Sequence, residues 1–491
     1  RAHKQEPQRK TATMSQPTQS LTLTLVSEQA ALSASVEHAL SVLVSLKAPD
    51  APPSERQPLE LVAVVDRSGS MRGPKMEAMK EALAFLVSHG LQKDDNFSLV
   101  AFDHQVETRL PVSAMDAAGK KKALETVAAL NTGGQTNLSG GLLKGIDVLS
   151  TAIGGAANAN RAVLLFTDGI ANNGITDSAG IVAAAQGAMA GAPLTIFTFG
   201  FGADHTESML RSLAENTNGL YYFIERSEDI GQSFADCLGG LVSVVAQNAV
   251  LTLDGLDGAT VAKAHCHYKQ EAAPRPGALA LQLGDIYAED EKDVLLTLRL
   301  PELPNGPHDG AAPAMRASLR YFSVATSAYV EAEAELPVSR PASTPAGQQP
   351  PARLAEQRER VSVTEAMAQA NALADAGQIE DGRALLQAAV AKAKASPCAA
   401  SPVVANVVRD ATAVEAGYSD AVSYRAYGSK MSQMAVMSHQ MQRSTHTSAP
   451  MYENRSKAAM KRAFISAPTS APPLSVPPPP ASASAPSAAA P

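Results

Sequence analysis

The chain has 491 residues, of which 45% are hydrophobic, and this length predicts more than one domain because a domain commonly holds about 100–200 residues. Its formal net charge of −7 argues against a nucleic-acid-binding protein, which would carry a basic face, and the sequence contains no apolar run of about 18 residues that would predict a membrane span. The three cysteines are too few and too far apart for a disulfide framework or a zinc module, so we expect a cytoplasmic protein.

The first segment of the chain is polar and is followed by two short alternating stretches. Residues 1–20 are predicted to be disordered, and the first residue, an arginine, leaves open that the natural chain extends further upstream. Within residues 21–57, the alternation of apolar and polar residues in 21–25 and 40–46 predicts two antiparallel strands, followed by a linker. Two strands are not stable alone, so we expect them to join strands from later in the chain.

Residues 58–246 alternate apolar strands with helices. This pattern predicts a doubly wound, mostly parallel α/β sheet. The central strand is the β-branched run from Leu61 to Val65, which ends at Asp66. A second apolar run ends in the same way at Asp168. Helices are expected at about 75–90, 117–130, 137–152, 177–190, 206–216 and 227–246.

The second half of the chain changes pattern twice. Residues 247–336 return to a period of two, which predicts a β-sandwich. The α/β domain is therefore inserted in this sandwich, between the two early strands and the later ones, or precedes it. Residues 337–352 are predicted to be a linker, and residues 353–465 a helical region. The Pro/Ala/Ser tail, residues 466–491, is predicted to be disordered.

Five oxygen-bearing side chains are expected to gather at one edge of the α/β sheet. In such sheets ligands bind at the carboxyl ends of the strands, where Asp66 and Asp168 lie, and the loop that carries Thr136 reaches the same edge. Ser68 and Ser70 follow Asp66 at alternate positions. Nearby carboxylates repel each other unless one is protonated or a cation lies between them. A set made only of oxygen atoms suits a hard divalent cation.

Two other interpretations of the same residues remain open. Ser68 or Ser70 fits the N-cap of the following helix, in which case Asp66 only starts a turn. A metal-dependent hydrolase with Asp66 as nucleophile or base would need a second acid–base group on the same edge, and we find none in the loops.

The stretch Asp66-Arg67-Ser68-Gly69-Ser70, together with Thr136 and Asp168-Gly169, resembles the metal-ion-dependent adhesion site (MIDAS) of von Willebrand factor type A (VWA) domains. The resemblance implies that Mg²⁺, or Mn²⁺ or Ca²⁺ in its place, contacts Asp66, Ser68, Ser70 and Thr136 directly or through water, and that Asp168 acts mostly through water. It also implies a non-enzymatic protein-binding module whose metal takes an Asp or Glu side chain of a partner. A shift of the last helix of the domain, 227–246, would then report this binding to the sandwich.

Residues 198–205 and 234–241 further resemble the VWA domain and flanking sandwich of plant RING-type ubiquitin ligases. A RING needs paired Cys and His ligands, which three scattered cysteines do not supply. We therefore expect no ligase activity from this chain itself. The alternative is the substrate-recognition part of a ligase assembly whose catalytic part is missing or lies on another chain.

Three further patterns are interpreted as structural. The His265-Cys266-His267 stretch has no second pair of metal ligands nearby in the sequence and is predicted to be part of a strand or turn. The acidic residues between 285 and 293 fit a solvated turn. The methionines at 431, 434, 437 and 441 fit a buried helix face, although such stripes also bind varied partners.

Overall fold

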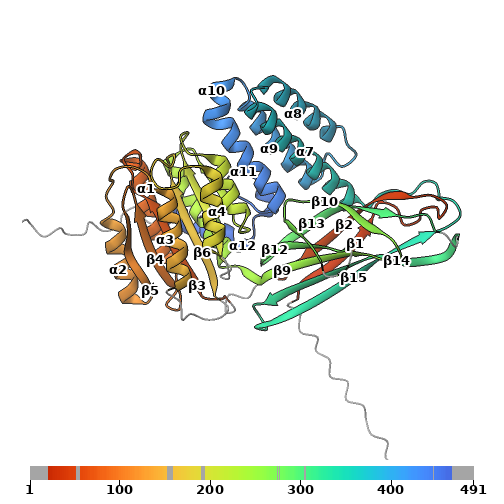
Figure 1. The fold of residues 1–491 in the computed structure, drawn as a ribbon, viewed down its shortest axis with the longest axis horizontal. Helices are drawn as coiled ribbons and strands as arrows, with labels where there is room; N and C mark the ends of the chain where they lie inside the picture. The colour runs from red at the N-terminus through yellow and green to blue at the C-terminus, as the bar shows by residue number, and fades with distance from the viewer. Residues whose placement is uncertain are drawn as a thin grey trace, which may run out of the picture.

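The computed structural model describes residues 20–50, 56–151, 159–189, 194–273, 275, 277–303, 306–445 and 447–466. The disorder predicted for 1–20 and 466–491 lies outside the described residues, except for positions 20 and 466, and so does much of the linker before the α/β sheet. An α/β sheet and a β-sandwich lie next to each other, and a group of helices lies against both (Figure 1).

The α/β part is a six-stranded sheet, and its central strand is buried along its whole length. Four of its five strand pairings are parallel, and only the edge strand β5 runs antiparallel to its neighbour. This arrangement confirms the predicted fold class. In spatial order the strands are β5 (Val106–Ala114), β4 (Asn96–Phe102), β3 (Leu59–Asp66), β6 (Asn160–Thr167), β7 (Thr195–Phe201) and β8 (Tyr221–Ile224).

Helices cover both faces of this sheet. On one face α3 lies very close to β3 because Gly145 has no side chain: a Cβ atom there would lie 2.3 Å from Cγ2 of Val64. On the other face α1 packs against α6. The helices are α1 (Pro74–Phe85), α2 (Ala117–Ala128), α3 (Leu138–Thr151), α4 (Ser178–Ala188), α5 (Glu207–Glu215) and α6 (Ile230–Leu241).

The helix predicted over 227–246 is wrong in its last part. Helix α6 ends at Leu241, and strand β9 begins at Val244. Two glycines precede this point, and the β-branched residues that follow favour a strand over a helix. The chain therefore passes from the α/β sheet into the sandwich within a few residues.

The sandwich contains two antiparallel sheets, and the first two strands of the chain belong to one of them. Strand β2 pairs with β13 over its whole length, from Lys47 opposite Glu291 to His38 opposite Leu300. The α/β part is therefore inserted between β2 and β9. One sheet has the order β1 (Thr22–Ser27), β2 (His38–Lys47), β13 (Glu291–Leu300), β10 (Thr260–His265), and the other β11 (Lys269–Ala272), β12 (Leu279–Tyr287), β9 (Val244–Gly255), β14 (His308–Ser323), β15 (Ala328–Arg340).

The linker predicted for 337–352 begins too early. Strand β15 continues to Arg340, and Val338 is buried inside the sandwich. Pro337 lies opposite Pro313 in this strand pair. Pro337 suggested a linker, but β15 is an edge strand, and an edge strand tolerates proline because one side of its backbone is unpaired.

The helical region packs onto the free edge of the α/β sheet. The backbone N–H of Tyr221 donates to Sδ of Met437 at 3.2 Å, and that of Phe223 donates to Sδ of Met434 at 3.4 Å. The methionine stripe of α11 therefore covers β8, which would otherwise expose a strand edge. The helices are α7 (Ala352–Asp375), α8 (Ile379–Lys394), α9 (Pro402–Ala416), α10 (Ala421–Ser423), α11 (Ser429–Met441) and α12 (Arg455–Ser466).

Helix α12 returns to the α/β sheet and is tied to α6 by buried charges. The Asp236 carboxylate of α6 is fully buried and accepts from Nζ of Lys457 and Nζ of Lys461, each at 2.8 Å. Burial alone would raise the pKa of Asp236, but the two lysines lower it below its usual value. Among the described helices, none combines the length and apolarity needed to cross a bilayer.

Candidate metal centre

Three loops meet at the carboxyl ends of β3 and β6, and backbone hydrogen bonds hold them together. The loop after β3 is joined to the loop before α3 twice: Gly69 N–H donates to the carbonyl of Gly134 at 3.0 Å, and Gly133 N–H donates to that of Arg67 at 2.6 Å. The loop after β6 joins them when Asn172 N–H donates to the carbonyl of Thr136 at 3.1 Å. The positions of the side chains on these loops are therefore fixed relative to one another.

Four predicted site residues are linked by hydrogen bonds, one of which is donated by a backbone N–H. Ser68 N–H donates to Oδ1 of Asp66 at 2.8 Å, and the hydroxyls of Ser68 and Ser70 lie 3.1 Å apart. The Ser70 hydroxyl donates to Oδ1 of Asp168 at 2.7 Å. Residues from β3 and β6, about a hundred positions apart in sequence, thus form one continuous polar group.

The hydroxyl of the fifth residue, Thr136, lies beside this group. A Cβ atom placed on Gly169 would lie 3.4 Å from Oγ1 of Thr136 and 3.8 Å from Oγ of Ser70. Both hydroxyls therefore approach the same point above Gly169, where a side chain would fill the space between them. The structure brings together all five residues that the sequence placed at this edge.

Both carboxylates are almost inaccessible to water. Asp66 is 0% exposed and Asp168 is 1% exposed. Burial raises the pKa of Asp66 to about 6, although hydrogen bonds from Thr167 and Ser68 oppose this shift, and the nearby Asp168 raises it slightly further. A buried carboxylate with a raised pKa is stabilised by protonation or by a nearby cation.

The N-cap interpretation of the two serines is wrong. Helix α1 is preceded by Gly73, not by a serine, and the Ser68 side chain makes no capping hydrogen bond to the short helical turn Gly69–Met71. The Ser70 hydroxyl is directed to Asp168 instead. The two hydroxyls are therefore available for a role at the site.

Two residues that the sequence analysis missed complete the site. The Thr167 hydroxyl donates to Oδ2 of Asp66 at 2.7 Å, and Lys75 Nζ donates to Oδ2 of Asp168. A threonine at the end of an otherwise apolar strand was a usable signal for the first. Lys75 lies in the first turn of α1, where a lysine is usually solvated, so the sequence carried no signal for its contact with Asp168.

The donor set fits a hard cation and does not fit a soft one. Carboxylate and hydroxyl oxygens are the ligands that Mg²⁺, Mn²⁺ and Ca²⁺ take in proteins, whereas zinc and copper sites usually include His or Cys. Within the described part of the chain, no group of three or more His, Cys, Asp or Glu residues could hold a metal ion. The three cysteines are also free.

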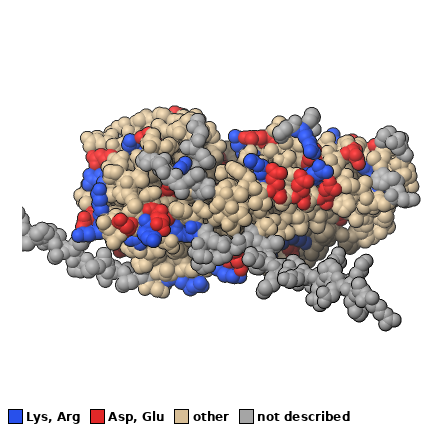
Figure 2. All heavy atoms as spheres, turned by 90° about the horizontal axis from the view of Figure 1, so that it is seen from below, with Lys and Arg blue, Asp and Glu red and all other residues tan. Residues whose placement is uncertain are grey.

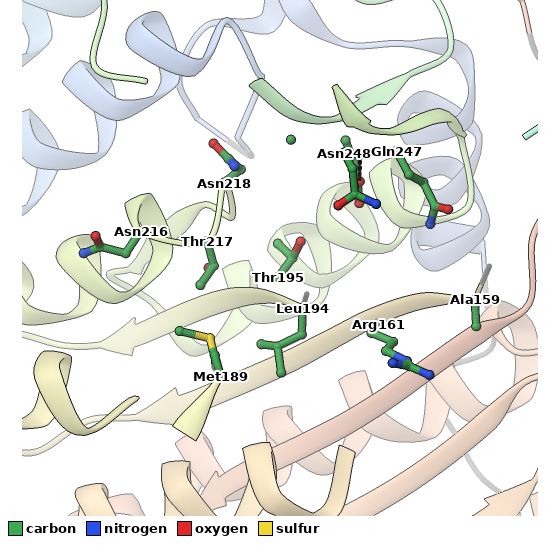
Figure 3. Close-up of a pocket in the computed structure, with 12 residues that line it drawn as sticks. Ala159, Arg161, Met189, Leu194, Thr195, Asn216, Thr217, Asn218, Gln247 and Asn248 are labelled. Carbon is green, nitrogen blue, oxygen red and sulfur yellow. Dashed lines mark hydrogen bonds between the residues drawn. The ribbon is translucent and has the colours of Figure 1, made fainter. Parts of the chain in front are cut away.

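A separate cavity of about 300 Å³ lies at the opposite end of β6 and β7, where these strands begin (Figure 3). Arg161 and Thr195 line it from the sheet, and Gln247 and Asn248 line it from the sandwich. Asp66 is the last residue of β3 and Asp168 follows β6, both at the carboxyl ends of the strands, so the cavity is not part of the candidate metal centre. On the face of the molecule seen in Figure 2, positive and negative side chains are interspersed.

Comparison with known proteins finds a family match for the α/β part. Residues 60–236 match the family model of the von Willebrand factor type A domain. Among solved structures, the chain is similar to a von Willebrand factor type A protein from Catenulispora acidiphila, with a TM-score of 0.64 and 17% identity over 80% of this chain and 89% of that one. It is also similar to the ArnB paralog VWA2 from Sulfolobus acidocaldarius, with a TM-score of 0.55 and 16% identity over 84% of this chain and 98% of that one. At these identities the likeness concerns the fold.

Three curated relatives are similar over smaller shares of their own length. An uncharacterized protein of Synechocystis is 30% identical over 55% of this chain and 63% of its own. The E3 ubiquitin-protein ligase WAV3 of Arabidopsis thaliana is 29% identical over 51% of this chain and 32% of its own. Inter-alpha-trypsin inhibitor heavy chain H1 of Sus scrofa is 34% identical over 35% of this chain and 19% of its own. The chain thus spans less than two thirds of each.

Proposed function

We propose, from the premise that residues 60–236 form a von Willebrand factor type A domain, that this protein is a metal-dependent protein-binding module. Mg²⁺, or Mn²⁺ or Ca²⁺, is held by Asp66, Ser68, Ser70 and Thr136, with Asp168 mostly acting through water. When bound, the ion supplies a positive centre that takes an Asp or Glu side chain of a partner.

The observation that carries this proposal is the convergence of the five side chains from three loops. Ser70 connects the group by its hydrogen bond to Asp168, and Thr136 approaches the same point above Gly169. Asp66 and Asp168 are both buried, and the one ammonium group of Lys75 offsets only one of the two negative charges, so ionising both without a further cation is unfavourable. Mg²⁺ takes an octahedral shell and usually keeps several waters, so two carboxylates and three hydroxyls, with Asp168 acting mostly through water, leave positions for water or a partner.

Protein binding is favoured over catalysis by the residues around the site. A hydrolase would need an acid–base group within reach of the carboxylates. Among the described residues, the titratable side chain that bonds to either carboxylate is that of Lys75, which is engaged with Asp168. We therefore assign this site to binding, in a reducing and cytoplasmic compartment that suits the three free cysteines.

A second candidate function is substrate recognition within a ubiquitin-ligase assembly. The relative WAV3 is an E3 ubiquitin-protein ligase, and the similarity spans 32% of its length. For this second candidate function, the same metal site binds the substrate of the ligase. The catalytic part then lies on another chain or in a part of the protein outside the present sequence.

The proposal is tested by titrating the metal-free protein with Mg²⁺ in a calorimeter. We expect saturable binding to the wild type and at least roughly tenfold weaker binding to Thr136→Val, which loses one hydroxyl ligand, a difference of about 1.4 kcal/mol. Thr126→Val is the matched control, because its hydroxyl bonds only within the exposed surface of α2, to the carbonyl of Lys122. Equal binding by the wild type and Thr136→Val would contradict the assigned ligand set.

The partner is tested separately by capture on immobilised protein. Proteins retained in Mg²⁺ and released by EDTA are expected to be absent from a matched column of Asp66→Asn. Retention that is unaffected by EDTA would mean that binding does not use the metal.

A further inference from the structure

We propose that Lys75 is the built-in counter-ion of this site, and that a divalent cation binds by separating Lys75 from Asp168. The inference rests on the proposed function, because it concerns the regulation of the same site. It assigns to Lys75 a role in setting metal affinity that the motif residues alone do not provide.

Lys75 and Ser70 bond to different oxygens of the Asp168 carboxylate. Lys75 Nζ donates to Oδ2 of Asp168, while the hydroxyl of Ser70 donates to Oδ1. Both oxygens of this carboxylate are thus engaged without any metal. The carboxylate of Asp168 is fully buried, whereas the side chain of Lys75 is 30% exposed, so only the lysine is free to move outward.

The ammonium group of Lys75 lies next to the ends of β6 and β7. Gly202 follows β7 with a φ of +69°, and a Cβ atom placed there would lie 3.6 Å from Nζ of Lys75. The ammonium group therefore reaches from α1 between two strand ends. Pro74 and Gly73 fix the start of α1 just before it.

The charges in the site explain why the two cations compete. Without metal, Lys75 offsets one of the two carboxylates, Asp66 and Asp168. With a divalent ion bound, the carboxylates are already neutralised, and the nearby ammonium group is repelled by the ion. The ion and the lysine together then leave the site with an excess of positive charge, which the carboxylate of a partner would neutralise.

Removing the lysine charge should raise the affinity for Mg²⁺ through its effects on both the metal-free and the metal-loaded site. The metal-free site of Lys75→Met holds two poorly compensated carboxylates, and its metal-loaded site lacks a repulsive neighbour. We therefore expect Lys75→Met to bind Mg²⁺ about tenfold or more tightly than the wild type, given the strength of charge interactions at partly buried sites. In EDTA the same variant is expected to unfold at a lower temperature than the wild type.

The experiment uses the full chain, with Mg²⁺ alone as the probe, calorimetry for affinity and circular dichroism for folding and melting. Lys80→Met is the matched control: Lys80 also lies on α1 and pairs with a carboxylate, that of Glu77, at 3.2 Å on the surface. It should leave both affinity and melting unchanged. Lys75→Arg keeps the charge and should stay close to the wild type.

The possible outcomes separate this inference from the proposed function. Unchanged or weaker Mg²⁺ binding by a folded Lys75→Met would overturn the role of Lys75 alone. An absence of Mg²⁺ binding by the wild type and by Lys75→Met, both folded, would overturn the metal site and with it the displacement of Lys75. Tighter binding together with lower metal-free stability would support the inference.

Discussion

Asp66→Asn is expected to abolish Mg²⁺ binding and, in EDTA at neutral pH, to raise the free energy of unfolding. Asparagine removes the charge that attracts the cation and also the cost of keeping that charge buried. The pKa of Asp66 is raised from 3.8 to about 6, mainly by burial. At about 1.4 kcal/mol per pKa unit, the cost of ionising Asp66 in the folded protein is on the order of 3 kcal/mol.

The sign of the pH dependence follows from the same shift. In the folded protein without metal, Asp66 keeps its proton to a higher pH than it does in the unfolded chain. The contribution of Asp66 to stability therefore falls as the pH rises from about 4 to about 6, and is constant above that. Asp66→Asn lacks this pH-dependent contribution of the carboxyl group, so its free energy of unfolding should exceed that of the wild type most clearly above pH 6.

The measurement is denaturant unfolding in EDTA between pH 5 and 8, with calorimetric Mg²⁺ titration at pH 7.5. Asp147→Asn serves as the control because Asp147 lies on the exposed surface of α3, paired with Lys144 at 2.8 Å. It should change neither quantity beyond a few tenths of a kcal/mol. An Asp66→Asn protein that still binds Mg²⁺ like the wild type would contradict the account.

Lys457→Met is expected to lower the free energy of unfolding by about 3 kcal/mol. Breaking a buried ion pair costs about 3–5 kcal/mol because the remaining charge is left without its partner. The lower end of this range applies because Lys461 still pairs with Asp236. The Lys457 ammonium also donates to the carbonyl of Ser444 at 3.0 Å, so a second acceptor is left without its donor.

The check is urea unfolding combined with hydrogen exchange of α12 and α6. Exchange should accelerate in 455–466, because the first anchor of α12 is lost. Adding Asp236→Asn should restore part of the lost stability, since it removes the uncompensated charge. In the wild type, the contribution of Asp236 is present above its ordinary pKa and is lost as the pH falls through its lowered folded value. A variant as stable as the wild type would mean that α12 is not held by this pair.

The sequence predicted the position of the candidate site because strand ends are encoded locally. Asp66 and Asp168 each terminate an apolar run, and parallel neighbouring strands bring such ends to one edge. The pairing of the first strands with a later one was also predictable, because two isolated strands leave an apolar face unburied.

The parts that could not be predicted depend on distant contacts. A lysine at the start of a helix, such as Lys75, has no periodic signal that points to a carboxylate on another strand. The same holds for Lys457, which is buried only because α12 folds back onto α6. The boundary between α6 and β9 was misplaced because the mostly apolar residues 242–246 extend the apolar pattern of the helix. Their valines favour a strand, and pairing with β12 and β14 decides the outcome.

The most direct test of the metal centre is a crystal structure of the full chain grown in Mn²⁺, with anomalous scattering used to locate the ion. Mn²⁺ prefers the same oxygen ligands as Mg²⁺. We predict one strong anomalous peak within about 2.0–2.3 Å of the hydroxyl oxygens of Ser68 and Ser70, with Lys75 Nζ moved away from Asp168. Crystals grown in Mn²⁺ that show no anomalous peak between Asp66 and Asp168, with Lys75 Nζ still bonded to Asp168, would contradict the assignment of this metal centre.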